Sequence, residues 1–318
     1  MDAKDYSGSE ENQKEYALYY SYQKVRDFIS SFLRDREIRF ASSKWWFVGL
    51  KVNNGLDLLN NFKRYQFFEY PTLIYHSLAR LNMPLLSFEN SEKRKQLAKF
   101  NSKFNRLVYD FDFCLDFDAK KEGLNIEDEK FSLELCKREL KEVADFFEKE
   151  TDMPYRQKCS GSGLHFEILH PISSLRRIGL AKKLEFFNDF ALALKDMLSL
   201  ETLDLTIYDN RRIWKTPFSI DTKTFRVAVP INKNDIKSFD YSKCKIKKVL
   251  EILNIGRFDE WNEYITLEDS FNVFKNNSYD FVDKKEHLKF KQDLFDVWKC
   301  LFNVDYNKSK RIMKKRGF

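Results

Sequence analysis

Apolar residues alternate with mostly acidic ones along residues 106–119, RLVYDFDFCLDFDA. One set of alternate positions is apolar, and the other carries four carboxylates: Asp110, Asp112, Asp116 and Asp118. Because side chains alternate between the faces of a strand, the pattern predicts a strand with one apolar and one acidic face. At ~6.5 Å and an effective dielectric near ~20, each neighbouring carboxylate pair costs about 2.5 kcal/mol. A hard divalent cation reverses that sign, so metal binding is favoured over the alternative, a solvated acidic face.

The periodicity of the rest of the chain predicts helices and strands in alternation. Helical spacing of apolar residues covers 14–35, 56–65, 91–101, 128–150, 175–199, 243–253, 284–302 and 306–315. Strand patterns cover 43–52 and much of 201–230, and residues 154–170 have the pattern of two strands around a glycine turn. The pattern of 72–81 predicts either a strand or a short helix. Residues 120–127 form a charged loop. Strand–helix–strand alternation around the acidic strand predicts an α/β protein with helices packed on a sheet face.

Composition predicts one compact unit. The 318 residues are 43% hydrophobic with 31 Phe, which allows a sizeable core. We expect a flexible tail at 1–13, a core at 14–232, and a mainly helical region at 233–318. No apolar run is long enough to span a bilayer, and the first fifteen residues are too polar for a signal peptide, so we expect no membrane partner. The cysteines are scattered, and free thiols suit a reducing, cytoplasmic setting, or a nuclear one in a eukaryote. The five cysteines form no Cys-x-x-Cys pair, so no zinc site is expected.

The net charge is +7. This mild surplus permits a polyanionic partner without demonstrating one. Basic residues crowd near the C-terminus in 308–316, a pattern that is usually a solvated face and less often a backbone-binding patch.

A second signal is residues 159–165, CSGSGLH. Two glycines and two serines between strands expose backbone N–H groups and hydroxyls that can hold phosphate oxygens. His165 begins the next strand and shares a face with Glu167. Hairpins need glycine in any case, and a histidine beside one is more often structural than catalytic.

A third signal follows Asp204. Cations recur after this carboxylate, with Pro217 and Ser219 among them: Arg211, Arg212, Lys215, Lys223 and Arg226. An acid followed by spaced cations suits a site that holds a metal and a triphosphate. Taken alone, an ordinary solvated hairpin is the better interpretation.

Together the three stretches resemble the archaeo-eukaryotic primase superfamily, most closely the small catalytic subunit of DNA primase. LVYDFD at 107–112 is similar to the family's Asp-x-Asp strand, and Ser160 to His165 to its Ser-Gly turn ending in histidine. The third motif is matched by Asp204, Arg212, Lys215, Pro217-Phe218-Ser219 and Lys223-Thr224, and 75–84 looks like the segment before the first motif. The likeness covers roughly residues 70–232. The chain departs from the family in having two acidic pairs, a shorter turn without arginine, Asp221 where a histidine is usual, and no cysteine zinc site.

The resemblance implies a primase-type catalytic core of mixed or antiparallel sheets flanked by helices, with extra helices at the C-terminus. It implies a DNA primase or primase-polymerase, a nucleotidyltransferase that makes primers on a single-stranded DNA template from nucleoside triphosphates with two Mg²⁺ or Mn²⁺ ions. The implied catalytic residues are Asp110, Asp112, Asp204 and His165, and the implied metal ligands are Asp110, Asp112, Asp204, Asp116 and Asp118. LVYDFD favours the pair Asp110 and Asp112 slightly. The implied nucleotide-binding residues are Ser160, Ser162, His165, Arg212, Lys215, Ser219 and Lys223. A primase large subunit is a further candidate partner, with the C-terminal helices as docking surface or lid.

Two other classes of function remain open. Another Asp-x-Asp phosphodiester enzyme, such as a nuclease, would use paired carboxylates without needing the basic run of 211–226. A catalytically inactive module would bind single-stranded nucleic acid with no cation requirement. A calcium loop over 110–118 is excluded because Cys114 and Leu115 are apolar and no glycine allows the sharp turn.

Overall fold

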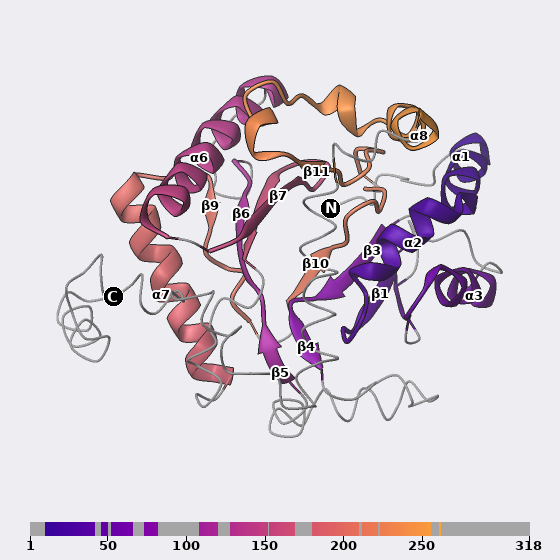
Figure 1. Ribbon diagram of the computed structural model, residues 1–318, viewed down its shortest axis with the longest axis horizontal. Helices are drawn as coiled ribbons and strands as arrows, with labels where there is room; N and C mark the ends of the chain where they lie inside the picture. The colour runs from indigo at the N-terminus through magenta and orange to yellow at the C-terminus, as the bar shows by residue number, and fades with distance from the viewer. Residues whose placement is uncertain are drawn as a thin grey trace, which may run out of the picture.

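The computed structural model describes residues 10–41, 46–49, 52–65, 73–81, 108–119, 128–151, 153–168, 180–209, 212–221, 223–255 and 261. The predicted helices at 91–101, 284–302 and 306–315 and the loop at 120–127 lie outside these residues. Figure 1 shows two main sheets side by side, with α6 (Glu129–Glu150) and α7 (Leu180–Leu198) outside one sheet. Outside the other sheet lie α1 (Glu10–Ser21), α2 (Gln23–Ser31) and α3 (Gly55–Tyr65).

The larger sheet has five strands in the order β11 (Pro230–Ile231), β7 (Tyr155–Cys159), β8 (Leu164–Ile168), β6 (Phe113–Phe117) and β9 (Leu203–Asp204), all paired antiparallel. Helices α6 (Glu129–Glu150) and α7 (Leu180–Leu198) cover its apolar face (Figure 1). Aromatic rings join the two layers: Phe113 meets Phe190 at 5.5 Å between centroids, and Phe147 meets Phe166 at 5.0 Å.

Helix α6 forms where its sequence predicts. The Asp128 carboxylate accepts hydrogen bonds from the amides of Lys130 (2.8 Å) and Phe131 (3.3 Å), which satisfies two of the unpaired donors at the helix start. A buried stripe then recurs at helical spacing and turns toward the sheet: Leu133, Cys136, Leu140, Val143 and Phe147.

The second sheet has four strands in the order β10 (Ile213–Lys215), β3 (Leu73–Ser77), β1 (Ile38–Ala41) and β2 (Trp46–Val48). Phe62 of α3 (Gly55–Tyr65) packs on Phe40 of β1 at 5.8 Å and on Tyr20 at 5.1 Å. The single helix predicted over 14–35 is two helices, α1 (Glu10–Ser21) and α2 (Gln23–Ser31). They are divided at Tyr22, whose backbone is extended with ψ 122°.

The prediction of a single acidic strand is wrong. The segment forms two strands, β5 (Val108–Phe111) and β6, which are separated at Asp112. β5 pairs with β4 (Ala79–Leu81) in a separate ribbon, whereas β6 joins the five-stranded sheet. The break occurs because the Asp112 amide donates to the Leu78 carbonyl (3.1 Å) and its carboxylate is held by two arginines.

Residues 233–255 pack into the same core as the strands. They include η3 (Lys233–Asp235), η4 (Tyr241–Cys244) and α8 (Ile246–Ile255), and the last of these lies where a helix is predicted. The Val227 amide donates to the Cys244 carbonyl (2.8 Å), and Val249 and Leu253 are buried.

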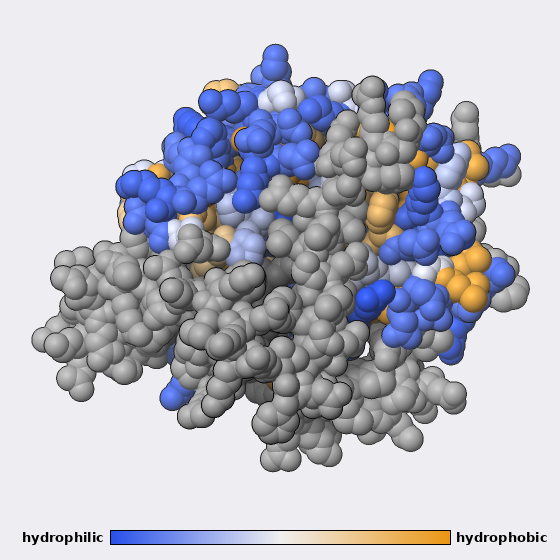
Figure 2. Space-filling view, viewed as in Figure 1, coloured by the Kyte–Doolittle hydropathy of each residue, from blue (hydrophilic) through white to orange (hydrophobic). Residues whose placement is uncertain are grey.

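The predicted class, an α/β protein with antiparallel sheets flanked by helices, is confirmed. Hydrophilic residues dominate the surface over α6 in Figure 2. Among the described residues, every helix is too short or too polar to cross a bilayer.

Candidate functional site

Three predicted site residues meet on the inner face of the five-stranded sheet. Asp116 of β6 lies in register with Asp204 of β9 on one side and with His165 of β8 on the other. The Nε2 atom of His165 is 3.3 Å from Oδ1 of Asp116. All three are buried, with 3–5% of their surface exposed. The acidic face of β6 is therefore not solvated.

The two carboxylates form a direct cross-strand pair of like charge, an arrangement that is destabilising by itself. The Asp204 side chain is held by Thr206, which lies just after β9. Its Oδ1 atom accepts hydrogen bonds from the amide and the hydroxyl of Thr206, both at 2.7 Å. The pKa of Tyr208 is raised well above its ordinary value by burial and then by Cys114, Asp204 and Asp116. Negative charge is thus concentrated where β6 and β9 meet.

The donor chemistry here suits a hard cation. Mg²⁺ is commonly held by one or two protein carboxylates, with substrate phosphates and water as its other ligands. Asp116 and Asp204 supply two carboxylates. Within the described part of the chain, no group of three or more His, Cys, Asp or Glu side chains is arranged to hold a metal ion. Asp118 lies just after the end of β6, two residues beyond Asp116, and is half-buried.

His165 is held as a neutral ring. Burial lowers its pKa to about 4, partly offset by the hydrogen bond to Asp116. The ring stacks on Trp214 of β10 at 3.9 Å between centroids, so the two sheets meet at this pair. Its Nδ1 atom is buried without a hydrogen-bond partner in the structure.

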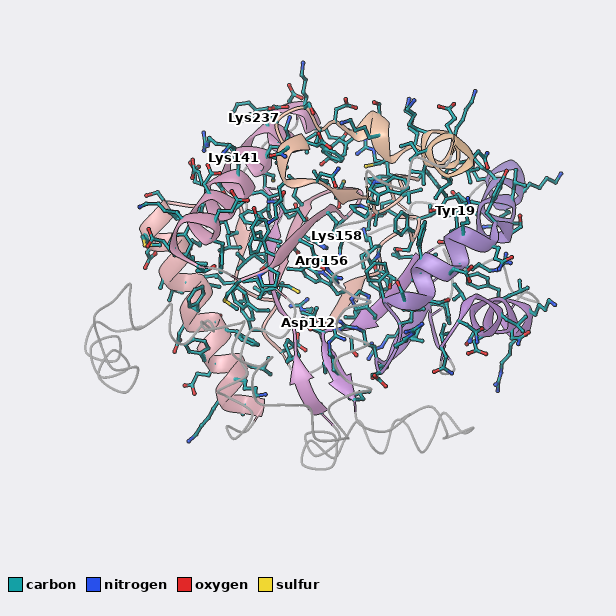
Figure 3. All side chains as sticks on the ribbon, viewed as in Figure 1. Tyr19, Asp112, Lys141, Arg156, Lys158 and Lys237 are labelled. Atoms are coloured by element: carbon teal, nitrogen blue, oxygen red, sulfur yellow. The ribbon has the colours of Figure 1, made fainter. Side chains whose placement is uncertain are left out.

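Trp214 is anchored in turn by Glu167. The indole Nε1 donates to Oε1 of Glu167 at 2.5 Å, and Arg156 Nε and Lys158 Nζ donate to the same carboxylate, the former at 2.6 Å. Burial alone would raise the pKa of Glu167, but Lys158 and Arg156 outweigh it and hold this pKa well below its ordinary value. Burial lowers the pKa of Lys158 to about 8. In Figure 3, Arg156 and Lys158 occupy the interior between the sheets.

Asp112 lies in a different environment. Arg36 Nη2 pairs with its Oδ2, and Arg80 Nε pairs with its Oδ1 at 3.0 Å. All three side chains are at most 2% exposed. Asp110 is opposite Arg80 in the β4–β5 ribbon, away from the sheet that contains Asp204. The geometry thus places Asp116 beside Asp204, in contrast to the preference for Asp110 and Asp112 taken from the sequence.

The glycine turn closes on itself between β7 and β8. The Gly163 amide donates to Ser160 Oγ (3.1 Å), and the Ser160 amide donates to the Gly163 carbonyl (2.9 Å). Gly161 has φ +99°, and a Cβ there would lie 2.8 Å from Cβ of Asp221. Lys215 Nζ donates to the Ser160 carbonyl (2.5 Å) and to Asp221, so a cation is fixed at the turn.

The other predicted nucleotide-binding residues have structural contacts. Arg212 donates from Nε to the Ile207 carbonyl (3.1 Å) and from Nη2 to the Thr206 carbonyl, which holds the loop after Asp204. Ser219 is fully buried and donates to the Thr216 carbonyl (2.7 Å). Ser162 and Lys223 are exposed at the edge of the site.

Sequence reasoning missed the group that supports His165: Trp214, Glu167, Arg156 and Lys158. A signal was present, because a four-residue turn sets the hairpin register. That register places Arg156 opposite Glu167 and Lys158 opposite His165. No sequence pattern predicts the contact of Trp214 with His165, because the two residues belong to different sheets.

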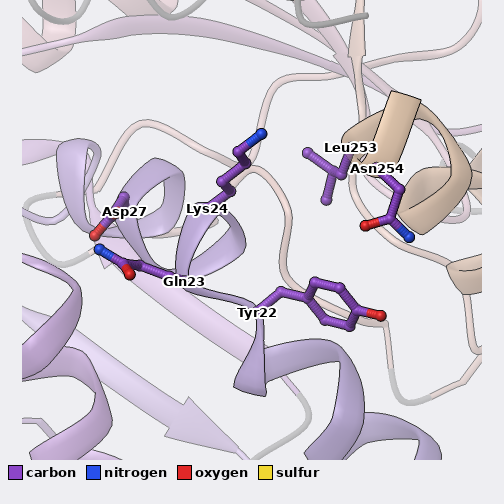
Figure 4. A pocket seen from close by; sticks show the side chains of 6 residues that line it. All are labelled: Tyr22, Gln23, Lys24, Asp27, Leu253 and Asn254. Atoms are coloured by element: carbon purple, nitrogen blue, oxygen red, sulfur yellow. The ribbon is translucent and has the colours of Figure 1, made fainter. Parts of the chain in front are cut away.

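A hollow of about 500 Å³ lies apart from these residues, between the α1–α2 junction and α8. Figure 4 shows its lining: Tyr22, Gln23, Lys24, Asp27, Leu253 and Asn254. Its mixed lining does not indicate one class of ligand.

No protein-family model matches the chain, and no curated protein sequence does. Among solved structures, the polymerase domain from Mycobacterium tuberculosis ligase D in complex with DNA aligns over 80% of this chain and 91% of that chain. The TM-score is 0.47 and the sequence identity is 12%. Similarity at this level assigns neither fold nor function to the present chain.

Proposed function

We propose that this protein is a metal-dependent nucleotidyltransferase of the primase type, which joins nucleotides on a single-stranded DNA template. The observation that supports it best is the direct pairing of Asp116 with Asp204, with His165 on the adjacent strand. A solvated hairpin would not bury two facing carboxylates. This pairing supports the assignment of Asp204 to the metal-binding position of the primase family's third motif.

In this proposal Asp116 and Asp204 hold Mg²⁺ or Mn²⁺, with Asp118 as a further ligand. The metal would neutralise triphosphate charge and make the attacking hydroxyl more acidic. Asp112 is assigned a structural role, because its charge is matched by Arg36 and Arg80.

The side chains around the carboxylates orient the substrate. The neutral His165 ring donates from Nε2 to Asp116 and so fixes the orientation of this carboxylate. Lys215 is placed beside the glycine turn by Asp221, where it can neutralise phosphate charge. Trp214 and Glu167 fix the plane of the His165 ring.

The test is template-directed extension with and without a primer, offering ribo- and deoxyribonucleotides in Mg²⁺ and in Mn²⁺. We expect the wild-type protein to extend, and Asp204→Asn to lose incorporation while its melting curve stays cooperative. Asp145→Asn is the matched control, because Asp145 is exposed on α6 and pairs with Lys141. Continued incorporation by Asp204→Asn would contradict the proposal. Cation-independent binding of single strands without incorporation would instead indicate the inactive binding module.

A further inference from the structure

An exposed aromatic residue, Phe225, lies on the loop between Asp221 and Arg226, and this loop contacts the glycine turn. We propose that Phe225 is a stacking platform for a nucleobase. This inference rests on the proposed function, because it places the base next to the turn and the lysine assigned to phosphate. Four observations support it: backbone conformation, exposure, position and neighbouring charge.

Phe225 has a backbone conformation that its residue type disfavours. Four described non-glycine residues have positive φ: Asp35, Ser199, Phe218 and Phe225. Asp tolerates this region, and Ser199 directly follows the end of α7, where left-handed residues are common. For bulky residues such as Phe, positive φ is a genuine outlier.

Phe218 and Phe225 differ in how far their side chains are buried. Phe218 is fully buried, and its ring packs on Phe28 at 5.2 Å and on Trp261 at 5.1 Å. Core packing therefore accounts for its strained backbone. Phe225 has φ +56° yet leaves 40% of its surface exposed. Strain without matching burial is typical of a residue kept for binding.

The loop holds Phe225 rigidly. The Phe225 amide donates to the Asp221 carbonyl (2.8 Å), and the Asp221 amide donates to the Arg226 carbonyl (2.7 Å). Oδ1 of Asp221 accepts from the amide of Lys223 at 2.7 Å. A loop whose backbone is held in this way loses little conformational entropy when a flat partner binds the ring.

The loop that carries Phe225 also contacts the glycine turn of the proposed phosphate site. Arg226 Nη1 donates to the Gly161 carbonyl (3.2 Å), and a Cβ on Gly161 would lie 3.2 Å from Oγ1 of Thr224. Tyr16 lies on one side of Phe225, with ring planes 11° apart and centroids 6.3 Å apart. Asp221 fixes both this loop and Lys215.

The charge around the ring fits a nucleotide better than an apolar partner. Lys223 is exposed two residues before Phe225. An exposed aromatic beside a cation is the usual pair for stacking a base and neutralising its phosphate. The base can belong to a nucleoside triphosphate or to a single-stranded nucleic acid, and the two sources share this chemistry.

The experiment compares Phe225→Ala, Phe225→Gly and Phe225→Trp with the wild-type protein. Each is titrated with ATP, with inorganic tripolyphosphate and with a short single-stranded oligodeoxynucleotide. Leu56→Ala is the control, because Leu56 is 65% exposed on α3. Stacking on one base predicts that Phe225→Ala weakens binding about 5- to 150-fold, with Phe225→Trp restoring it.

The pattern across ligands identifies the source of the base. Weaker binding of ATP with unchanged tripolyphosphate binding assigns the base to the nucleoside triphosphate. Weaker binding of the oligonucleotide alone assigns it to the nucleic acid. If the wild-type protein binds these ligands and Phe225→Ala binds them equally well, the inference is overturned while the proposed function stands. If the wild-type protein binds none of them, both are overturned.

Thermal melting separates backbone strain from the ring. Phe225→Gly and Phe225→Ala both remove the ring, but only glycine adopts positive φ without strain. We expect Phe225→Gly to melt at a higher temperature than Phe225→Ala while binding the base equally weakly. Equal melting temperatures would show that the strain is absent and would remove that support.

Discussion

Asp112 and Asp116 are four residues apart on one acidic segment, and their surroundings are opposite. Asp112 lies between two buried arginines, whereas Asp116 lies beside a second carboxylate and a neutral histidine. The first arrangement matches the charge of Asp112 within the protein. The second brings two carboxylates together, a donor set that suits a divalent cation. The same residue type can thus have a structural role at one position and a functional role at another, depending on the charges that packing brings to it.

The largest expected effect is on stability at the Asp112 end. Asp112→Asn leaves Arg36 and Arg80 buried without their carboxylate, which should lower the free energy of unfolding by about 3–5 kcal/mol. Denaturant titration measures this value. Asp145→Asn, which removes an exposed ion pair, should change it by less than about 1 kcal/mol. Similar losses for the two variants would contradict the structural role of Asp112.

The next effect is on activity at the Asp116 end. Asp116→Asn should lower nucleotide incorporation by at least about 100-fold, because it removes a ligand of the metal ion that would neutralise the charge of the triphosphate. The same change removes a repulsive cross-strand pair, so stability should stay constant or rise by up to about 1 kcal/mol. Extension assays and denaturant titration on one preparation test both parts. An active Asp116→Asn protein would return the metal site to Asp110 and Asp112.

A smaller effect is expected from adding metal. A cation that binds only the folded protein at ten times its dissociation constant stabilises it by about 1.4 kcal/mol. Mg²⁺ should therefore raise the melting temperature of the wild-type protein but not that of Asp116→Asn. An equal rise in both proteins would place the bound cation elsewhere.

The smallest effect concerns His76, which lies near the buried cations that hold Asp112 and those that hold Glu167. Burial lowers its pKa well below 6.5, as do Arg36, Lys158 and Arg156, with Glu167 acting in the opposite direction. The unfolded chain therefore takes up a proton near pH 6.5 that the folded protein does not bind. Stability from this residue is present above pH 6.5 and falls by about 1 kcal/mol over the first pH unit below it.

His76→Asn tests this pH dependence. The Nδ1 atom of His76 lies 3.0 Å from the Thr216 hydroxyl, a contact that an asparagine amide can replace. We expect the variant to lose less stability than the wild-type protein between about pH 7 and about pH 5.5. Parallel curves for the two proteins would show that His76 does not contribute.

Much of the fold could be predicted because it depends on neighbours in sequence. Helix α6 was predicted over 128–150 and is found over Glu129–Glu150, since its cap and its apolar stripe are local. The hairpin of β7 and β8 follows from alternation around the glycine turn. Strand β1 was missed, because four residues at 38–41 have little pattern of their own and are defined by pairing with β3.

The candidate site could be predicted only in part. Motif spacing selected Asp204, His165 and Lys215, but it favoured Asp110 and Asp112 over Asp116. The break at Asp112 depends on Arg36 and Arg80, which are remote in sequence. The support of His165 by Trp214 depends on how the two sheets pack.

By itself, the sequence determined which residues share a face, because alternation of side chains along a strand is a property of the backbone. It therefore placed acids on one side of β6, and His165 with Glu167 on one side of β8. Only the tertiary structure decided which charges those faces meet. Arginines reach Asp112, while Asp204 and His165 reach Asp116, because strand pairing and sheet packing join segments between which the sequence contains no local signal.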